Sequence, residues 1–400
     1  MVHTPVAGFT AGAVSAGVRK DGRIDLALIA GHDSYPAAAV FTKNRLAAAP
    51  VQIGRRHLEG GRLRAVLANS GCANAATGDK GLEACLATCQ AAAKALGCPA
   101  DEVLPCSTGV IGQLLPAEKI VNAMPGLAAS LSPEGLPQAE GAIMTTDAFM
   151  KMAQATVTIQ DRPVTVVGLA KGAGMIHPDM ATMLAYVLTD AAASAPALQK
   201  ALEIAAGLSF NRASVDGDTS TNDTLLLWAS GQAGNAELQA DDPELAILAA
   251  AVSKVCQELA AMLVADGEGA GHLIRVVVTG AESDQAARHT AFAIAHSPLC
   301  KTAFAGRDPN WGRVLSTAGA EAARRGLGFA EDKTCLWIGD ALIAENGVYT
   351  NSTAEEEAAQ IMKRERYQIR LYLGLGQGQF WVFTSDLDHK YIEINADYRS

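Results

Sequence analysis

The sequence has few aromatic residues and no excess of positive charge. Aromatic side chains make up 5% of the 400 residues, too few for the stacking platforms that bind single-stranded nucleic acid. Acidic residues outnumber basic ones, 42 to 32, and the net charge is −10. A nucleic-acid or anionic-membrane partner would require a basic face, so we expect neither. The net charge does not exclude anionic small molecules as ligands, because the local field of a pocket can oppose it.

The sequence also lacks a targeting segment and an uninterrupted membrane span. Its first twenty residues have neither the charged head nor the leucine-rich run of a signal peptide. The apolar stretch 245–264 includes four polar or charged residues, which predicts a core helix. Cys85 and Cys89 have no second cysteine pair or histidine cluster nearby, so we expect buried thiols and no metal site. We therefore expect a cytoplasmic protein.

Hydrophobic residues make up 49% of the chain, which indicates a globular protein, and its length allows two or three domains. Apolar runs of strand and helix type alternate, and strands repeatedly end in glycine-rich polar loops. We predict a mixed α/β fold with two unequal halves. The predicted elements include a helix at 80–96, helices within 117–143 interrupted by Pro133 and Pro137, a hairpin around 160–162, a helix starting at Asp242 and a strand at 390–394.

Two segments contain candidate catalytic groups. Thr108 and Gly109 follow a predicted strand, and their backbone N–H groups with the Thr108 hydroxyl could form an oxyanion hole. The alternative is an ordinary turn. In KGAGMIHPDMAT, cleavage of the Ala181–Thr182 bond would give Thr182 a free α-amine, which could act as base for its own hydroxyl. The alternative is a hydroxyl at a helix start, and spacing alone does not decide.

Two further segments are rich in acidic residues. The run at 216–223 begins like a calcium loop, but Thr221 stands where glycine is needed and Leu227 where glutamate is needed. We therefore predict a network of side-chain hydrogen bonds there and no calcium. Glu268 lies between two glycines at a helix exit, where it would bind a substrate ammonium group or face solvent.

Six short segments, separated along the chain, are more informative together than singly. They are STGVIG at 107–112, KGAGMIHPDMATML at 171–184, VDGDTSTND at 215–223, DGEGA at 266–270, DPNWGR at 308–313 and INADYRS at 394–400. In this order they resemble the ornithine acetyltransferase (glutamate N-acetyltransferase) family of arginine biosynthesis. The resemblance extends over essentially the whole chain.

The resemblance implies that the precursor cuts itself between Ala181 and Thr182. It would yield an N-terminal chain, 1–181, and a C-terminal chain, 182–400, entwined in a layered α/β fold and assembled as two copies of each. Thr182 would be the nucleophile, with Thr108 and Gly109 as the oxyanion hole. The positions that match the family's substrate contacts are Lys171, Thr182, Glu268, Asn395 and Ser400.

The implied activity is transfer of acetyl from N-acetylornithine to glutamate through an acetyl-threonine enzyme. It requires no cofactor, because both half-reactions share one acyl-enzyme. Acetyl-CoA enters only as a second acetyl donor, which some members use and others do not. Two alternatives stay open. One is an amidohydrolase or aminopeptidase that cleaves itself by the same mechanism, and the other is a small-molecule binding protein that has lost catalytic activity.

Several positions depart from the family pattern, among them Ala148, Cys72, Ala76 and Ser400. Ala148 stands where the family has a substrate-contacting threonine, and Thr146 is the nearest hydroxyl in sequence. Cys72 replaces an asparagine that many members have, and Ser400 replaces a terminal threonine. These changes leave the nucleophile and the oxyanion pair intact.

Overall fold

The computed structural model describes residues 4–177 and 183–397, and the chain divides into two compact units. Among the described residues, the first unit comprises residues 4–177, 183–211 and 218–263. The second comprises residues 212–217 and 264–397. The two units are unequal in size, and their boundaries differ from the predicted chains 1–181 and 182–400, which stay a prediction.

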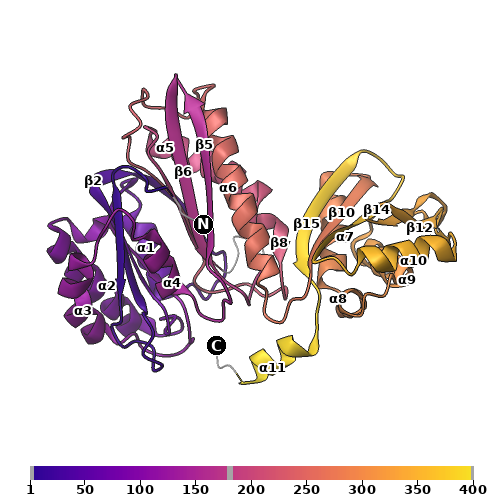
Figure 1. Cartoon of the computed structure of the whole chain (residues 1–400), viewed down its shortest axis with the longest axis horizontal. Coiled ribbons are helices and arrows are strands. Elements are labelled where there is room, and N and C mark those ends of the chain that lie inside the picture. Colours follow the sequence, from indigo (N-terminus) through magenta and orange to yellow (C-terminus); the bar gives the residue numbers. More distant parts are fainter. Residues whose placement is uncertain (1–3, 178–182, 398–400) are drawn as a thin grey trace. The chain divides into compact units, whose positions relative to one another are not determined.

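The first unit contains an eight-stranded sheet of order β4-β3-β2-β9-β7-β6-β5, with β1 paired to β2 (Figure 1). Its strands are β1 (Phe9–Val14), β2 (Leu26–Phe41), β3 (Arg62–Asn69), β4 (Val103–Ser107), β5 (Lys151–Ile159), β6 (Arg162–Lys171), β7 (Leu184–Thr189) and β9 (Thr224–Ala229). Its helices are α1 (Ala49–His57), α2 (Gly78–Leu96), α3 (Ala117–Ala129), α4 (Leu136–Ile143), α5 (Ala195–Leu208) and most of α6 (Leu245–Ala265).

The layers of this unit follow from the alternation of side chains along its strands. Leu28 of β2 belongs to a core shared with α1, α2 and α3. The next residue, Ile29, belongs to a second core, shared with Leu169 of β6 and Tyr186 of β7. Because successive residues of a strand point to opposite faces, the β2–β3 part and the β6–β7–β9 part of the sheet share one core, while α1–α3 cover the outer face. This is the layered α/β architecture that the resemblance implies.

Helix α6 packs closely on β6. A Cβ atom at Gly168 of β6 would approach the side chains of Val255 and Leu259 to 2.6 and 2.8 Å, so glycine is required for this contact. By length and mean hydropathy, 1.7, α6 could cross a membrane. Its packing on β6 instead confirms the prediction of a core helix.

Strands from both sides of the predicted cleavage point interleave in this sheet. β7 and β9 follow Thr182 in sequence, yet they lie between β2 and β6, which precede it. β7 is parallel to β9, with Leu184 opposite Thr224, and antiparallel to β6, with Leu184 opposite Lys171. The expected entwining of 1–181 with 182–400 is therefore present in the strand order. Cleavage itself stays a prediction, because residues 178–182 lie outside the described residues.

The second unit contains a seven-stranded sheet of order β13-β12-β11-β14-β10-β15-β8. Its strands are β8 (Ala213–Ser214), β10 (Leu273–Ala281), β11 (Cys335–Ile338), β12 (Ala341–Glu345), β13 (Val348–Tyr349), β14 (Arg366–Tyr372) and β15 (Gly378–Ser385). Its helices are α7 (Asp284–His296), α8 (Pro298–Ala305), α9 (Trp311–Arg325), α10 (Ser352–Ile361) and α11 (His389–Asp397). Helix α7 packs on β10 and β15 and contributes Ile294 to the core of the unit.

Where local chemistry specifies the backbone, the predicted elements are confirmed. α2 ends at Gly97, whose φ of 68° is the left-handed cap that glycine favours. The segment 117–143 forms two helices, α3 and α4. The β5–β6 hairpin turns at Gln160 and Asp161, both at positive φ.

One predicted helix start and one predicted strand are wrong. The helix expected from Asp242 begins at Leu245, because the Asp242 carboxylate accepts the Glu244 N–H at 2.8 Å in a turn that precedes the helix. The strand expected at 390–394 is part of α11. There the Asp388 carbonyl accepts the Tyr391 N–H at 3.1 Å, which starts a helical turn. No described side chain of α11 is buried, so its apolar alternation does not place it in a sheet.

Candidate functional site

The predicted oxyanion segment follows directly from β4, which ends at Ser107. Gly109 has φ +130°, and a Cβ atom there would lie 2.4 Å from the carbonyl carbon of Gly71 and 2.6 Å from the nitrogen of Cys72. Both the conformation and the space therefore require glycine. Thr108 and Gly109 are half-buried, so this turn keeps access to solvent.

The donors in this turn differ in part from the prediction. The Thr108 N–H donates to the Asn69 carbonyl at 2.9 Å, so it is already used. Among the described residues, the Gly109 N–H has no hydrogen-bond acceptor. Lys171 Nζ donates to Thr108 Oγ1 at 2.9 Å. The ammonium occupies a lone pair of the hydroxyl and leaves its proton for another acceptor. The two available donors are therefore the Gly109 N–H and the Thr108 hydroxyl.

A network of amide side chains holds the turn in place. Asn222 Nδ2 donates to the Ser107 carbonyl at 2.9 Å and to the Ala73 carbonyl at 2.6 Å. The Ser107 hydroxyl donates to Asn69 Oδ1 at 2.7 Å. Asn222 belongs to the segment 215–223, for which the sequence predicts a hydrogen-bond network, and that prediction is confirmed. The role of Asn222 itself was not predicted, because its two partners are distant in sequence.

Lys171 is the last residue of β6 and is only 6% exposed. Nearby, Asp147 Oδ1 accepts the Gly172 N–H at 2.6 Å and Lys151 Nζ at 2.7 Å. Its Oδ2 accepts the Thr145 N–H at 2.9 Å. Burial alone would raise the pKa of Asp147, but the Lys171 and Lys151 ammonium groups outweigh it and hold the pKa at about 2. An ionised carboxylate therefore lies beside Lys171.

The start of β7 lies near the same lysine. The Met183 N–H donates to Asp223 Oδ1 at 2.8 Å, and the Lys171 charge acts on the Asp223 carboxyl. The predicted nucleophile Thr182 and its neighbour Ala181 lie outside the described residues. Neither Asp147 nor Asp223 was predicted from the sequence. The only available signals were that Asp147 lies between Thr146 and Ala148, a position that departs from the family pattern, and that Asp223 ends the quoted segment VDGDTSTND.

Two other predicted residues meet in the second unit. Asn395 Nδ2, on α11, donates to Glu268 Oε2 at 2.8 Å, so the two predicted substrate contacts are hydrogen-bonded to each other. Ser400 lies outside the described residues. The structure thus joins Thr108 to Lys171 and Glu268 to Asn395, each within one unit.

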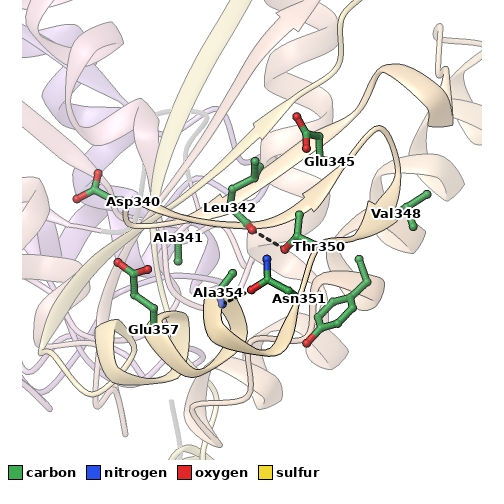
Figure 2. Close-up of a pocket in the computed structure, with 10 residues that line it drawn as sticks. Asp340, Ala341, Leu342, Glu345, Val348, Thr350, Asn351, Ala354 and Glu357 are labelled. Atoms are coloured by element: carbon green, nitrogen blue, oxygen red, sulfur yellow. Dashed lines mark hydrogen bonds between the residues drawn. The ribbon is translucent and has the colours of Figure 1, made fainter.

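A pocket of about 520 Å³ opens elsewhere in the second unit (Figure 2). Three carboxylates, those of Asp340, Glu345 and Glu357, line it. Its wall is held by hydrogen bonds from Thr350 Oγ1 to the Leu342 carbonyl at 2.7 Å and from the Ala354 N–H to Asn351 Oδ1 at 3.0 Å. None of the predicted site residues lines it, so it is not part of the candidate site.

Comparison with known proteins decides the family. The model of the ArgJ family matches residues 10–400. The chain belongs to the ArgJ family. The arginine biosynthesis bifunctional protein ArgJ of Geobacter sulfurreducens is 43% identical over 395 residues, which cover 99% of this chain and 100% of that protein. The protein of the same name from Brucella suis is 45% identical over 390 residues, covering 96% and 94%.

A solved ArgJ structure also matches. The arginine biosynthesis bifunctional protein argJ of Bacillus halodurans is 38% identical with a TM-score of 0.51, and the match covers 54% of this chain and all of that one. Membership of the ArgJ family confirms the resemblance that the six segments indicate. The prediction that the chain is an enzyme is confirmed with it.

In this ArgJ-family chain, the ion pairs of Asp147 predict an acid-dependent loss of stability. The folded pKa, about 2, lies below the usual 3.8, so Asp147 stabilises the fold above pH 4 and ceases to do so as pH falls toward 2. We expect the free-energy difference between wild type and Asp147→Asn to shrink by about 2 kcal/mol over that range. Urea unfolding at several pH values between 7 and 2 measures it. A difference independent of pH would contradict this assignment.

Proposed function

We propose that this chain cleaves itself between Ala181 and Thr182 and then transfers acetyl from N-acetylornithine to glutamate. The observation that carries the proposal is the donor pair of Gly109 N–H and Thr108 hydroxyl, the latter oriented by Lys171 at 2.9 Å. Such a pair, fixed before reaction, suits the oxyanion of acyl transfer. The relatives from Geobacter sulfurreducens and Brucella suis are named for arginine biosynthesis, which supports these substrates.

In the first half-reaction, the Thr182 hydroxyl attacks the acetyl carbonyl carbon of N-acetylornithine. The Thr182 α-amine takes the hydroxyl proton, and the carbonyl oxygen becomes an oxyanion held by the Gly109 N–H and the Thr108 hydroxyl. Collapse breaks the C–N bond, and the proton passes to the departing nitrogen. Ornithine leaves, and the acetyl group remains as an ester on Thr182.

The second half-reaction reverses these steps with glutamate. The unprotonated amine of glutamate attacks the ester carbonyl, the same donor pair holds the new oxyanion, and the Thr182 oxygen leaves with a proton. No cofactor is consumed, because the ester conserves the acetyl group between the two steps. Acetyl-CoA would enter only as another donor to the same threonine.

Self-cleavage uses the same hydroxyl as nucleophile, before the Thr182 α-amine exists. The Thr182 hydroxyl attacks the Ala181 carbonyl, the C–N bond breaks, and the hydroxyl proton passes to the departing nitrogen, which becomes the Thr182 α-amine. Water then opens the resulting ester. Residues 182–400 make up 219 of the 400 residues, close to the 54% of this chain that covers all of the solved Bacillus halodurans chain. A solved relative of this length is what cleavage near this point would produce, which supports the proposal. We further propose that the two products stay together as two copies of each, in the cytoplasm.

We propose that Lys171 contacts a substrate carboxylate and that Glu268, Asn395 and Ser400 complete the substrate contacts. Replacing Glu268 with alanine removes a carboxylate suited to an ammonium group, so the KM for N-acetylornithine is expected to rise about tenfold with a smaller change in kcat. Steady-state kinetics measure both. Glu393→Ala, an exposed acid on α11, is the matched control. Unchanged KM values for both substrates would remove Glu268 from the site.

One assay distinguishes the proposal from its two rivals. Purified protein is incubated with N-acetylornithine, with and without glutamate, and acetylglutamate, acetate and ornithine are measured. Acetylglutamate formed together with ornithine supports the transferase. Acetate released without glutamate, faster than transfer, indicates the amidohydrolase. Stoichiometric binding without either product indicates an inactive binding protein.

A further inference from the structure

One buried acid near the proposed site has no role in the mechanism above. Asp223 immediately precedes β9 and is buried, with 2% of its surface exposed. Its Oδ1 accepts the Met183 N–H at 2.8 Å. Its Oδ2 is buried and makes no hydrogen bond with the described residues. Met183 follows Thr182 in sequence, so its nitrogen is bonded directly to the Thr182 carbonyl carbon.

Hydrogen bonds fix both the backbone N–H and the backbone carbonyl of Met183. The Thr224 N–H donates to the Met183 carbonyl at 3.0 Å, while Asp223 accepts the Met183 N–H. Asp223 is itself anchored, because its carbonyl accepts the Thr42 N–H at 3.0 Å. These contacts set the register in which Leu184 pairs with Thr224. The first described residue after the nucleophile is therefore fixed by the Asp223 side chain.

The surroundings of Asp223 favour its neutral form. Burial raises its pKa well above the usual value, and the Met183 N–H, the Lys171 ammonium and the Ser220 hydroxyl only oppose this in part. An ionised carboxylate would leave Oδ2 negative, buried and without a hydrogen bond, which is costly. A protonated acid avoids that charge and still accepts the Met183 N–H through Oδ1.

A neutral acid also suits the chemistry proposed for Thr182. Its α-amine must be unprotonated to accept the hydroxyl proton. An ionised carboxylate that accepts the N–H of the next residue, Met183, would favour the ammonium form of this amine, whereas a neutral carboxyl does not. We propose that Asp223 is a positioning residue that, as a neutral acid, fixes the Met183 amide and through this peptide bond orients the preceding residue, Thr182. This inference rests on the function proposed above.

Two substitutions separate the hydrogen bond from the charge. Asp223→Asn keeps an acceptor for the Met183 N–H and is always neutral, so self-cleavage and kcat are expected to stay within about threefold of wild type. Asp223→Ala removes the acceptor, and kcat is expected to fall by at least about tenfold while KM changes by less than about twofold. Circular dichroism and thermal melting check that both variants fold. An Asp223→Ala variant as active as wild type would overturn the inference.

The Asp223→Asn variant tests whether Asp223 is neutral even if Asp223→Ala does not fold. If Asp223 is neutral, the acidic limb of the pH profile of kcat/KM is the same for wild type and Asp223→Asn. If it is ionised, removing its charge lowers the apparent pKa of the amine by about one unit and shifts that limb. A shifted limb, or loss of activity in a folded Asn variant, overturns the inference.

An infrared difference spectrum makes the test independent of activity. At pH 7, wild type minus Asp223→Asn is expected to contain the band of one protonated carboxyl group. Its absence would overturn the inference even if wild type transfers acetyl normally. Conversely, wild type that neither cleaves nor transfers would refute the proposed function, while the band would still report the state of Asp223. The two failures are therefore distinguishable.

Discussion

A Thr182→Ala variant is expected to remain a single chain of 41.4 kDa and to lose acetyl transfer entirely. Alanine has no hydroxyl, so it can neither attack the Ala181 carbonyl nor carry the acetyl group. Both events depend on the same atom, and for this reason the effect on each should be complete. Mass spectrometry of the purified variant and a transfer assay on the same preparation measure them.

Thr182→Ser is the matched control, because serine keeps the hydroxyl and, after cleavage, the α-amine. It is expected to cleave and transfer at reduced but measurable rates. Thr182→Ala would refute the nucleophile assignment if it stayed uncut yet fully active, because the acetyl group would then need another carrier. Efficient cleavage of Thr182→Ala at the same bond would refute the self-cleavage mechanism.

The second large effect concerns the oxyanion hole. Thr108→Val keeps the shape of the side chain but removes the hydroxyl that Lys171 orients. Loss of one such donor typically costs about 10²–10³ in kcat, and we expect a decrease of this size with little change in KM. The Gly109 N–H remains and accounts for the residual rate. Steady-state transfer kinetics, after confirming that the variant has cleaved, measure the effect.

Thr108→Ser restores the hydroxyl and is expected to recover most of the lost rate. This comparison also controls for Lys171, which loses an acceptor in Thr108→Val but regains one in Thr108→Ser. If Thr108→Val transferred acetyl within about threefold of wild type, the hydroxyl would not be an oxyanion donor. The Gly109 N–H would then be the only donor of the proposed pair.

The parts of the fold that could be predicted are those specified by neighbouring residues. Gly97 ends α2 because its left-handed backbone suits glycine, and the β5–β6 turn has positive φ at Gln160 and Asp161. The position of β7 between β6 and β9 could not be predicted, because pairing over long separations leaves no local pattern. The strand expected at 390–394 fails for a related reason. Its apolar alternation has no sheet partner, and a helical turn forms from Asp388 instead.

The residues of the candidate site likewise include some that could be predicted and some that could not. Thr108 and Lys171 were predicted from the resemblance, and the structure places them in hydrogen-bond contact. Asp147 and Asp223 were not, because in sequence each resembles a solvated acid in a turn. Their importance comes from burial and from partners that the fold brings near, such as Lys171 and Met183. The expectation that the Thr108 N–H is an available donor failed because Asn69, distant in sequence, accepts it.

In the proposed mechanism Thr182 becomes an N-terminal nucleophile that carries the acetyl group. Intact mass spectrometry, before and after addition of N-acetylornithine without glutamate, detects both the cleavage and the acetyl group. We predict two species of about 19 and about 23 kDa, the shares of 41.4 kDa that 181 and 219 of 400 residues make, with one acetyl group added to the larger. One uncut species of 41.4 kDa that transfers acetyl normally, or an acetyl group on the smaller species, would contradict this mechanism.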